Sequence, residues 1–195
     1  MSGSEKYNLD RRAVVAKLLA DPGELLVVTG LGSATYDAGA AGDRAENFYL
    51  WGAMGGSVMI GLGLAIAQPT RRVLVITGDG EMLMGMGSLA TVAAQAPKNL
   101  AVAVLDNGQF GETGAQRSHT GHGTDLAAIA AACGWPATTI ATTMAEIELL
   151  AGRLRREALF AVIKISTAEV PRVLPPRDGA YLTHRFQAAL GVAEP

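Results

Sequence analysis

The sequence predicts a doubly wound α/β domain built on a parallel sheet, and three observations favour this class. Five short β-branched runs are almost continuously apolar, as expected of strands that are buried on both faces of a parallel sheet. Stretches with helical spacing of apolar residues lie between these runs, and such alternation is typical of helices that cover both sheet faces. The chain has 195 residues, which is enough for one domain with a sizeable core, so we expect a single domain over residues 1–195.

The expected elements alternate along the chain. The strands are expected at Leu25–Thr29, Val73–Thr77, Ala101–Leu105, Thr138–Thr142 and Phe160–Ile165. The helices are expected at Asp10–Ala20, Gly55–Ala67, Glu81–Gln95, Asp125–Cys133, Met144–Arg156 and Tyr181–Leu190. A Pro-bearing stretch, Glu169–Gly179, leads to the last helix. Residues 169–195 are therefore expected to form a C-terminal extension, which either packs on the domain or projects as a surface arm.

The composition excludes several classes of function. Hydrophobic residues make up 49% of the chain and charged residues 17%, which is too apolar for a disordered protein. The net charge of −2 gives no electrostatic reason to expect binding to nucleic acid or to an anionic membrane. The single Cys133 cannot form an internal disulfide, and five charged residues lie within the first 12 positions, where a signal peptide would need an apolar core. We therefore expect a soluble cytoplasmic protein.

The segments that follow the predicted strands are the places to look for a site. In a doubly wound sheet, ligands bind beyond the carboxyl ends of the strands, where loops and helix N-termini converge. Three such segments are unusual in this chain: Gly30–Asp37, Gly78–Gly80 and Asp106–Thr113.

The run Gly78-Asp79-Gly80-Glu81 directly follows a predicted strand and enters a helix at once. Its two glycines let the backbone approach a ligand, and the free N–H groups at a helix start suit a diphosphate. Asp79 would repel that diphosphate unless a cation lay between them, and Mg²⁺ takes oxygens from protein and phosphate together. Asn107 lies 28 positions beyond Asp79, about one helix and one strand later. Both side chains are therefore expected at the same edge of the sheet, on neighbouring strands.

These residues resemble the thiamine diphosphate motif, in which Gly-Asp-Gly is followed by an Asn at this spacing. The resemblance implies that a metal ion is held by the Asp79 carboxylate, the Asn107 side chain and the backbone carbonyl of Gln109. The chain departs from the usual pattern at two positions, with Asp106 in place of Asn and Glu81 where Ser is frequent. Glu81 lacks the hydroxyl with which a Ser side chain would contact phosphate, whereas the backbone N–H contact does not depend on the side chain.

Further cofactor contacts follow from the same resemblance. The run Trp51-Gly52-Ala53-Met54-Gly55 matches the element that holds the cofactor in a bent form, with Met54 under the bend and the Gly52 carbonyl accepting from the 4′-amino group. Ser33 is the candidate in a phosphate-contacting turn, and the N–H groups of Gly111 and Glu112 could cap the diphosphate.

The resemblance covers about Leu25 to Ile165 and is to the sulfopyruvate and phosphonopyruvate decarboxylase group of thiamine-diphosphate-dependent 2-oxo acid decarboxylases. It is carried by Asn47–Gly56, by Leu105–Gly108 and by the terminal pairs Arg185-Phe186 and Ala189-Leu190. In that family the glutamate that activates the cofactor lies on a separate pyrimidine-binding domain. The resemblance therefore implies that this chain is the pyrophosphate-binding (β) subunit of a hetero-oligomer. Its partner, a pyrimidine-binding (α) subunit, would carry the glutamate, with the cofactor at the interface.

Residues on the substrate side are candidates by position. Glu112 and Thr113 follow the metal-binding turn and are expected near the thiazolium ring. His119 is the third catalytic candidate, because histidine shuttles protons near neutral pH. It lies with Gln116 and His122 on a polar loop. The histidines are equally well explained as plain loop residues, and Glu112 as a solvated residue at a helix start. For an acidic substrate tail, the cations expected near the pocket are Arg117 and the two histidines.

The function predicted is non-oxidative decarboxylation of a small 2-oxo acid by this chain together with its partner subunit. Two alternatives stay open on the sequence alone. One is a subunit of a carboligase, which joins the same cofactor-bound carbanion to an aldehyde or ketone. The other is a binding or regulatory subunit that keeps the fold without turnover.

Overall fold

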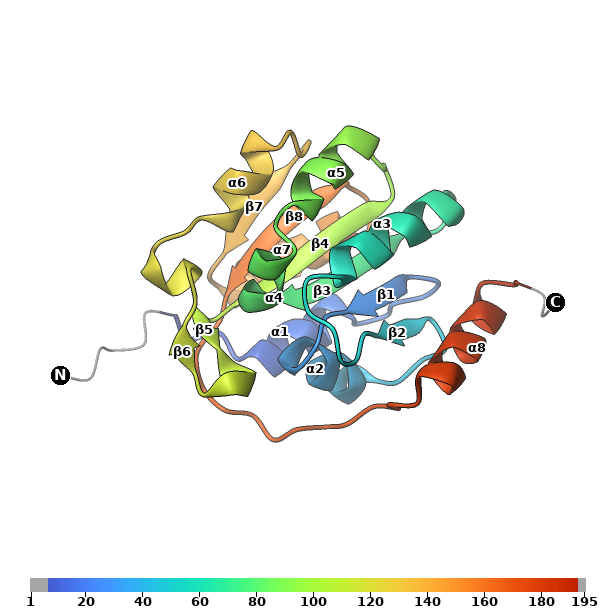
Figure 1. Cartoon of the computed structure of the whole chain (residues 1–195), viewed down its shortest axis with the longest axis horizontal. Helices are drawn as coiled ribbons and strands as arrows, with labels where there is room; N and C mark the ends of the chain where they lie inside the picture. The colour runs from blue at the N-terminus through green and yellow to red at the C-terminus, as the bar shows by residue number, and fades with distance from the viewer. Residues whose placement is uncertain (1–6, 193–195) are drawn as a thin grey trace.

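A six-stranded sheet forms the centre of the molecule in the computed structural model, which describes residues 7–192 (Figure 1). The strand order is β2-β1-β3-β4-β8-β7, and every neighbouring pair is parallel. The strands are β1 (Leu26–Thr29), β2 (Asn47–Tyr49), β3 (Val73–Gly78), β4 (Leu100–Asp106), β7 (Thr138–Ala141) and β8 (Leu159–Lys164). This architecture confirms the predicted doubly wound α/β class.

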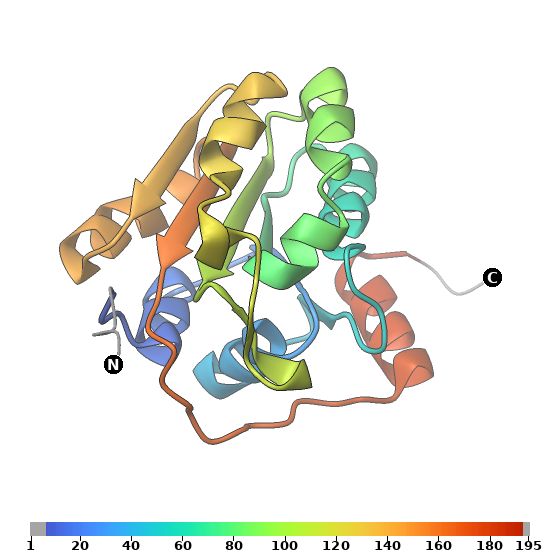
Figure 2. The ribbon, with the colours of Figure 1, turned by 60° about the vertical axis from the view of Figure 1, so that its left-hand side comes forward.

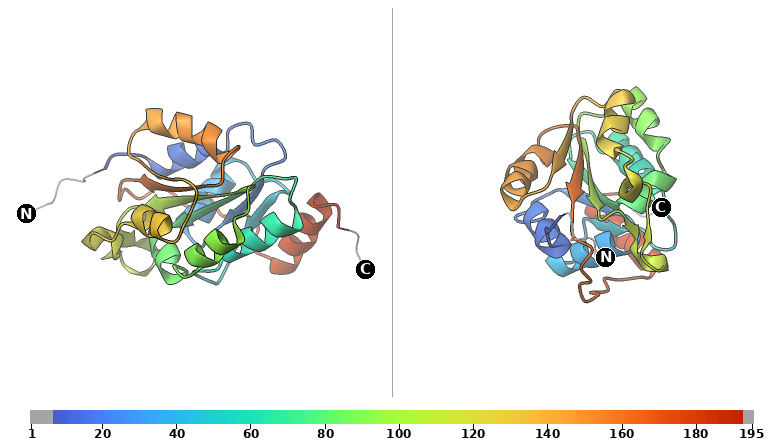
Figure 3. Two further views of the ribbon diagram at one scale, coloured as in Figure 1. Left: turned by 90° about the horizontal axis from the view of Figure 1, so that it is seen from above. Right: turned by 90° about the vertical axis from the view of Figure 1, so that its left-hand side faces the viewer.

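Helices cover both faces of this sheet, as the end-on view in Figure 3 shows. The helices on one face are α1 (Arg11–Leu18), α2 (Ser33–Ala41) and α7 (Met144–Leu154). The other face is covered by α3 (Ser57–Ala67), α5 (Ser88–Gln95) and α6 (Leu126–Ala132). Within residues 7–192, no helix is long and apolar enough to cross a membrane.

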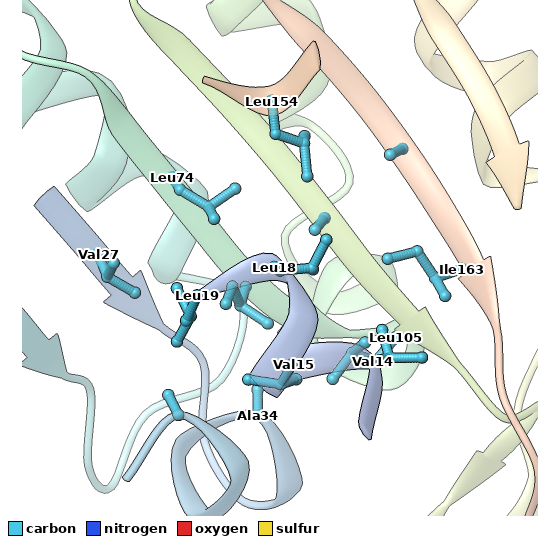
Figure 4. Close-up of a cluster of buried hydrophobic side chains, with 14 of the residues drawn as sticks. Val14, Val15, Leu18, Leu19, Val27, Ala34, Leu74, Leu105, Leu154 and Ile163 are labelled. Carbon is cyan, nitrogen blue, oxygen red and sulfur yellow. The ribbon is translucent and has the colours of Figure 1, made fainter. Parts of the chain in front are cut away.

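Two apolar cores lie on the two sides of the sheet, because successive side chains of a strand point to opposite faces. In β1, Val27 contributes to the core under α1 and α2, whereas Leu26 and Val28 contribute to the core under α3. Figure 4 shows the first of these cores, with Val14 and Leu18 of α1 among its side chains. Burial on both faces explains why the strand sequences are almost continuously apolar.

Among the elements of the main sheet and its covering helices, β2 and α2 were not expected from the sequence. The edge strand β2 is only three residues long, and α2 is built from Ser, Ala, Thr and Gly with little apolar periodicity. The helix expected over Glu81–Gln95 is divided into α4 (Asp79–Met84) and α5. The break falls at Gly85, where a Cβ would overlap the carbonyl oxygen of Gly55. The backbones of Gly55 and Gly85 thus lie in close contact at the break between the two helices.

A small hairpin lies between β4 and α6. Its strands are β5 (Gln109–Phe110) and β6 (Gln116–Arg117), and the single-turn helix η1 (Gly111–Thr113) connects them. A second such turn, η2 (Thr120–His122), follows the hairpin.

The chain returns across the molecule after β8. Residues 166–178, here called the strap, have no regular structure and run past α1 and α2 toward β2 (Figure 2). Helix α8 (Gly179–Ala189) then lies beside β2. The Trp51 indole N–H donates to the Pro176 carbonyl at 2.9 Å, and Arg185 pairs with Asp43 at 2.7 Å. The C-terminal extension is thus packed on the domain as far as residue 192.

Candidate functional site

A cavity of about 250 Å³ opens at the carboxyl edge of the sheet. In the sheet, β2 lies on one side of β1 and β3 lies on the other, so the strand order reverses direction at β1. The cavity lies at this reversal, which is the usual ligand position in doubly wound sheets. Residues after β1, β3 and β4 form its wall, together with Met54 from the loop before α3. The predicted site residues in its lining are Ser33, Met54, Gly78, Asp79, Gly80, Glu81, Asn107, Gln109, Gly111, Glu112 and Thr113. We call this space the cofactor cavity.

The Asp79 carboxyl is buried at the first position of α4. Its Oδ2 accepts hydrogen bonds from the Ser118 hydroxyl and, at 2.7 Å, from the Thr120 hydroxyl. Burial raises the pKa of this carboxyl above its ordinary value; the two hydroxyls lower it in part, and nearby Asp106 raises it further. No lysine, arginine or histidine among residues 7–192 forms an ion pair with Asp79. A buried carboxylate without a counter-charge is costly, so the position is suited to a cation.

Asp106, at the end of β4, is also a buried carboxylate, but unlike Asp79 it has a cationic partner. Its Oδ2 pairs with the Lys164 ammonium group, and its Oδ1 accepts from the Gly108 N–H at 3.0 Å. The Thr120 hydroxyl lies 2.8 Å from Asp106 Oδ1 as well as near Asp79. One hydroxyl proton serves one acceptor at a time, so Thr120 links the two carboxylates without satisfying both. The charge of Asp106 is therefore compensated and that of Asp79 is not.

Asn107 and Gln109 enter the cofactor cavity from the turn after β4. The Asn107 Oδ1 accepts a hydrogen bond from the Gln109 N–H at 2.9 Å, which closes a tight turn around Gly108 with φ of 71°. The structure thus brings Asp79, Asn107 and Gln109 to one cavity from the neighbouring strands β3 and β4, as the spacing in the sequence predicted.

Glu81 is a second buried carboxyl in the wall of the cofactor cavity. Its Oε2 accepts from the Thr77 hydroxyl at 3.0 Å, whereas Oε1 has no hydrogen bond of good geometry among the described residues. Burial is the main cause that raises the pKa of this carboxyl, and Ser57, Thr77 and the Leu31 backbone lower it in part. A Cβ at position 30 would overlap Glu81 Oε2, so any residue other than Gly30 would displace the Glu81 carboxyl.

The loop before α3 supplies one residue to the cavity. Met54 lines it and remains 39% exposed, so its side chain is available to a ligand. Gly52 is exposed with φ of 73° and does not line the cavity. A Cβ at Gly52 would meet no atom within 4 Å, so the open space beside this glycine is available to another molecule.

The hairpin folds over the start of α4. The Phe110 ring occupies the space above Gly80, where a Cβ would come within 2.6 Å of it. The turn η1 places Glu112 and Thr113 in the cavity wall, and both side chains are exposed. Glu112 pairs with Arg172 of the strap at 3.2 Å, and the Thr113 hydroxyl lies 2.9 Å from Gln116 Oε1.

The residues predicted to line the active-site mouth from the loop after the hairpin do not line the cofactor cavity. The exposed His119 packs edge-on against Phe110, with 6.5 Å between ring centroids, and is not among the cavity-lining residues of the described chain. His122 and Arg117 are also exposed and outside that lining. The residues that face the site are Ser118 and Thr120, which the sequence analysis did not single out. Their small polar side chains at alternate positions were the available signal.

A second cavity of about 540 Å³, here called the strap cavity, lies between the strap and the hairpin. It adjoins the cofactor cavity, because Arg11, Ser33, Asn107, Gln109, Gly111 and Glu112 line both. Its outer wall is formed by residues 167–172 of the strap. The sequence analysis did not predict this wall, because its residues are distant from every recognised motif.

The sequence matches one protein family over most of its length. Residues 30–165 match the thiamine pyrophosphate enzyme family, in the part described as its C-terminal TPP binding domain. The chain is 33% identical over 186 residues to sulfopyruvate decarboxylase subunit beta of Methanocaldococcus jannaschii, with 91% of this chain and 95% of that protein covered. It is 44% identical over 138 residues to phosphonopyruvate decarboxylase of Streptomyces viridochromogenes, with 70% and 34% covered. The chain therefore spans about a third of the length of the phosphonopyruvate decarboxylases that it matches.

Solved structures share the fold at lower sequence identity. Benzoylformate decarboxylase from Polynucleobacter necessarius superimposes with a TM-score of 0.72 at 18% identity, covering 84% of this chain and 34% of that one. A 2-oxoglutarate:ferredoxin oxidoreductase from Magnetococcus marinus gives a TM-score of 0.64 at 17% identity, with 80% and 62% covered.

Proposed function

Because this chain belongs to the thiamine pyrophosphate enzyme family, we propose that it is the cofactor- and Mg²⁺-binding subunit of a two-subunit, non-oxidative 2-oxo acid decarboxylase. The observation that carries the proposal is the convergence of Asp79, Asn107 and Gln109 on one cavity at the carboxyl edge of the sheet. The named activities of the sulfopyruvate and phosphonopyruvate decarboxylases support an acidic 2-oxo acid as substrate.

The donor set fits Mg²⁺. Residues 7–192 contain no group of three or more His, Cys, Asp or Glu side chains that could hold a metal ion. The available ligands are one carboxylate, one amide oxygen and one backbone carbonyl, and Mg²⁺ accepts such a partial set because it completes its shell with phosphate and water oxygens. Ser118 and Thr120 both hold Asp79 Oδ2, so we assign Oδ1 to the metal.

The cavity wall also fits a diphosphate. A Cβ at Gly78 would meet no atom within 4 Å, so the backbone there is open to a ligand. Glu81 stands where a charged carboxylate would repel phosphate, but burial raises its pKa and favours the neutral form. A neutral carboxyl can donate a hydrogen bond to a phosphate oxygen.

The chemistry divides between the cofactor and this chain. Bound thiamine diphosphate supplies the electron sink that decarboxylation of a 2-oxo acid requires. Asp79, Asn107 and Gln109 would hold the metal and diphosphate, and Met54 would support the bend of the cofactor. Glu112 and Thr113 lie at the exposed rim of the cavity, where they can contact a substrate and exchange protons with solvent.

We assign the activating glutamate to a partner subunit. The Methanocaldococcus relative, 95% of which this chain covers, is itself named a subunit beta. Part of the rim of the cofactor cavity is apolar and exposed, since Met54 and Met84 both line it and are 39% and 64% exposed. Exposed apolar side chains beside a ligand site are typical of a surface that another protein covers.

The test is reconstitution of activity. The neighbouring reading frames are searched for a pyrimidine-domain subunit. The chain is expressed alone and together with such a subunit, and CO₂ release from sulfopyruvate and phosphonopyruvate is measured with thiamine diphosphate and Mg²⁺. We expect turnover only from the assembled pair. Full turnover by the chain alone would contradict the two-subunit proposal, and carboligation products formed with an added aldehyde would favour the carboligase alternative.

A further inference from the structure

The strap cavity is the space into which a substrate can extend beyond the cofactor. It shares six lining residues with the cofactor cavity, so the two spaces adjoin each other. A 2-oxo acid whose carbonyl carbon meets the cofactor has a short tail, and the adjoining cavity is where that tail can lie. The groups lining the strap cavity therefore bear on substrate choice.

The strap is fixed in place by a buried charge cluster. Asp37 of α2 is fully buried and accepts from Arg11 and, at 3.1 Å, from the Arg12 Nε. The two arginines also reach the strap, where Arg11 donates to the Val170 carbonyl at 3.4 Å and Arg12 to the Pro171 carbonyl at 2.6 Å. The backbone immediately before Arg172 is thus tied to α1 and α2.

Arg172 is presented at the cavity by this anchored backbone. Its guanidinium lies over the Tyr36 ring, 5.6 Å from the centroid, and its NH2 nitrogen contacts Glu112 Oε2 at 3.2 Å. The Arg172 and Glu112 side chains are 63% and 38% exposed, and such exposed ion pairs contribute little. The guanidinium carries five N–H donors and uses one nitrogen on Glu112, so donors remain for an anion.

The balance of charge in the strap cavity leaves Arg172 as the available cation. Arg11 also lines the cavity, but its guanidinium already donates to buried Asp37 and to the carbonyls of Ser33 and Val170. The acidic residues in the lining are Glu112 and Glu169, both exposed. Among the described residues of this lining, Arg172 is the cation whose partner can be exchanged for a ligand.

We propose that the strap cavity binds the negatively charged tail of the 2-oxo acid and that Arg172 recognises it, displacing Glu112. This inference rests on the proposed function and names the residue that selects substrates with an acidic tail. A phosphonate or sulfonate presents several oxygens to the planar guanidinium, which can take two of them at once, and the Tyr36 ring holds that plane in position. Neither Arg117 nor the histidines, the cations expected from the sequence, lines this cavity in the described chain.

Steady-state kinetics of the assembled enzyme test the assignment. Arg172→Gln is expected to lower kcat/KM for phosphonopyruvate by about 10- to 100-fold, the range of a lost hydrogen bond to a charged group, mainly through KM. Turnover of pyruvate, whose tail is an uncharged methyl group, is expected to be unchanged, and Arg172→Lys to restore part of the loss. Arg177→Gln is the matched control, because Arg177 lies on the same strap over Trp51 and outside the cavity lining. An equal loss on both substrates, or no loss on phosphonopyruvate, overturns the assignment.

A binding measurement separates this inference from the proposed function. The probe is 3-phosphonopropanoate, which has the acidic tail but no keto group, titrated by ³¹P NMR into the full chain with thiamine diphosphate and Mg²⁺. We expect Arg172→Gln to weaken its binding about 10-fold or more, with Arg177→Gln unchanged. Equal dissociation constants for wild type and Arg172→Gln overturn the subsite. If the assembled wild type decarboxylates no 2-oxo acid, the proposed function fails, while the titration still decides the subsite.

Discussion

At the scale of single residues, three buried aspartates differ in what compensates them. Asp37 is paired with two arginines and Asp106 with Lys164, whereas Asp79 has only hydroxyl partners among residues 7–192. Burial raises the pKa of both Asp37 and Asp79, and the arginines beside Asp37 lower it in part. Asp37 and Asp106 hold neighbouring elements together through their ion pairs. Asp79 lines the cofactor cavity, where a bound cation would balance its charge.

The Asp37 cluster gives a stability prediction at this scale. Asp37→Asn leaves the buried Arg11 without its counter-charge, and we expect a loss of about 3–5 kcal/mol of unfolding free energy in urea denaturation. Asp43→Asn is the control, because its pair with Arg185 is partly exposed and should contribute about 1 kcal/mol or less. Equal losses in the two variants would show that burial of the Asp37 cluster is not what matters.

At the scale of elements, the strands and helices that could be predicted from the sequence are mainly those that bury a clear apolar pattern. The central strands are long and apolar because both faces are covered, so the sequence identified them. The three-residue edge strand β2 and the small-residue helix α2 carry no strong pattern, and both were missed. The convergence of Asp79 and Asn107 was predictable, because the ends of neighbouring parallel strands meet at one sheet edge. Ser118 contacts Asp79 across 39 positions of sequence, and such a contact follows only from the path of the hairpin.

Helix α3 offers a paired test of packing against propensity. A Cβ at Gly61 would overlap Val75 of β3, whereas a Cβ at Gly63 meets nothing within 4 Å. We expect Gly63→Ala to stabilise the chain by up to about 1 kcal/mol, because alanine favours helix. Gly61→Ala should destabilise it by about 1–3 kcal/mol, because the extra methyl overpacks the core. Chemical denaturation of both variants measures the difference, and a gain in both would contradict the close approach of α3 to the sheet.

At the scale of the whole molecule, the site is assembled from segments that span nearly the entire chain. The loops after β1, β3 and β4 form its inner wall, and the strap after β8 forms its outer wall. The sequence located the inner wall, because its residues follow strands. It could not locate the outer wall, because the strap is held by arginines of α1 and not by any local pattern.

Binding of thiamine diphosphate with Mg²⁺ should stabilise this assembly. At about 100 times the dissociation constant the gain is about 2.7 kcal/mol, and thermal unfolding measures it as a rise in Tm that EDTA abolishes. Without metal, the raised pKa of Asp79 makes its contribution to stability favourable at acid pH and lost as pH rises through that pKa. A bound cation favours the carboxylate, so the Mg²⁺-dependent rise should be larger at about pH 8 than at about pH 5.

The variant Asp79→Ala should remove both the Mg²⁺-dependent part of the rise and its pH dependence. Glu148→Ala is the control, because Glu148 forms an exposed pair with Lys17 and lines neither cavity in the described chain. A Tm rise in Asp79→Ala equal to that of the wild type would remove Asp79 from the metal site.

The anchoring of the strap also has a consequence for loop closure in folding. Arg11 and Arg12 contact Val170 and Pro171 across 159 positions of sequence, so these bonds close a loop that contains most of the described chain. Closing a long loop costs conformational entropy, and contacts of high sequence separation slow folding. The wall that we assign to substrate selection therefore depends on contacts of very long range, whereas the inner wall of the site follows from neighbouring strands.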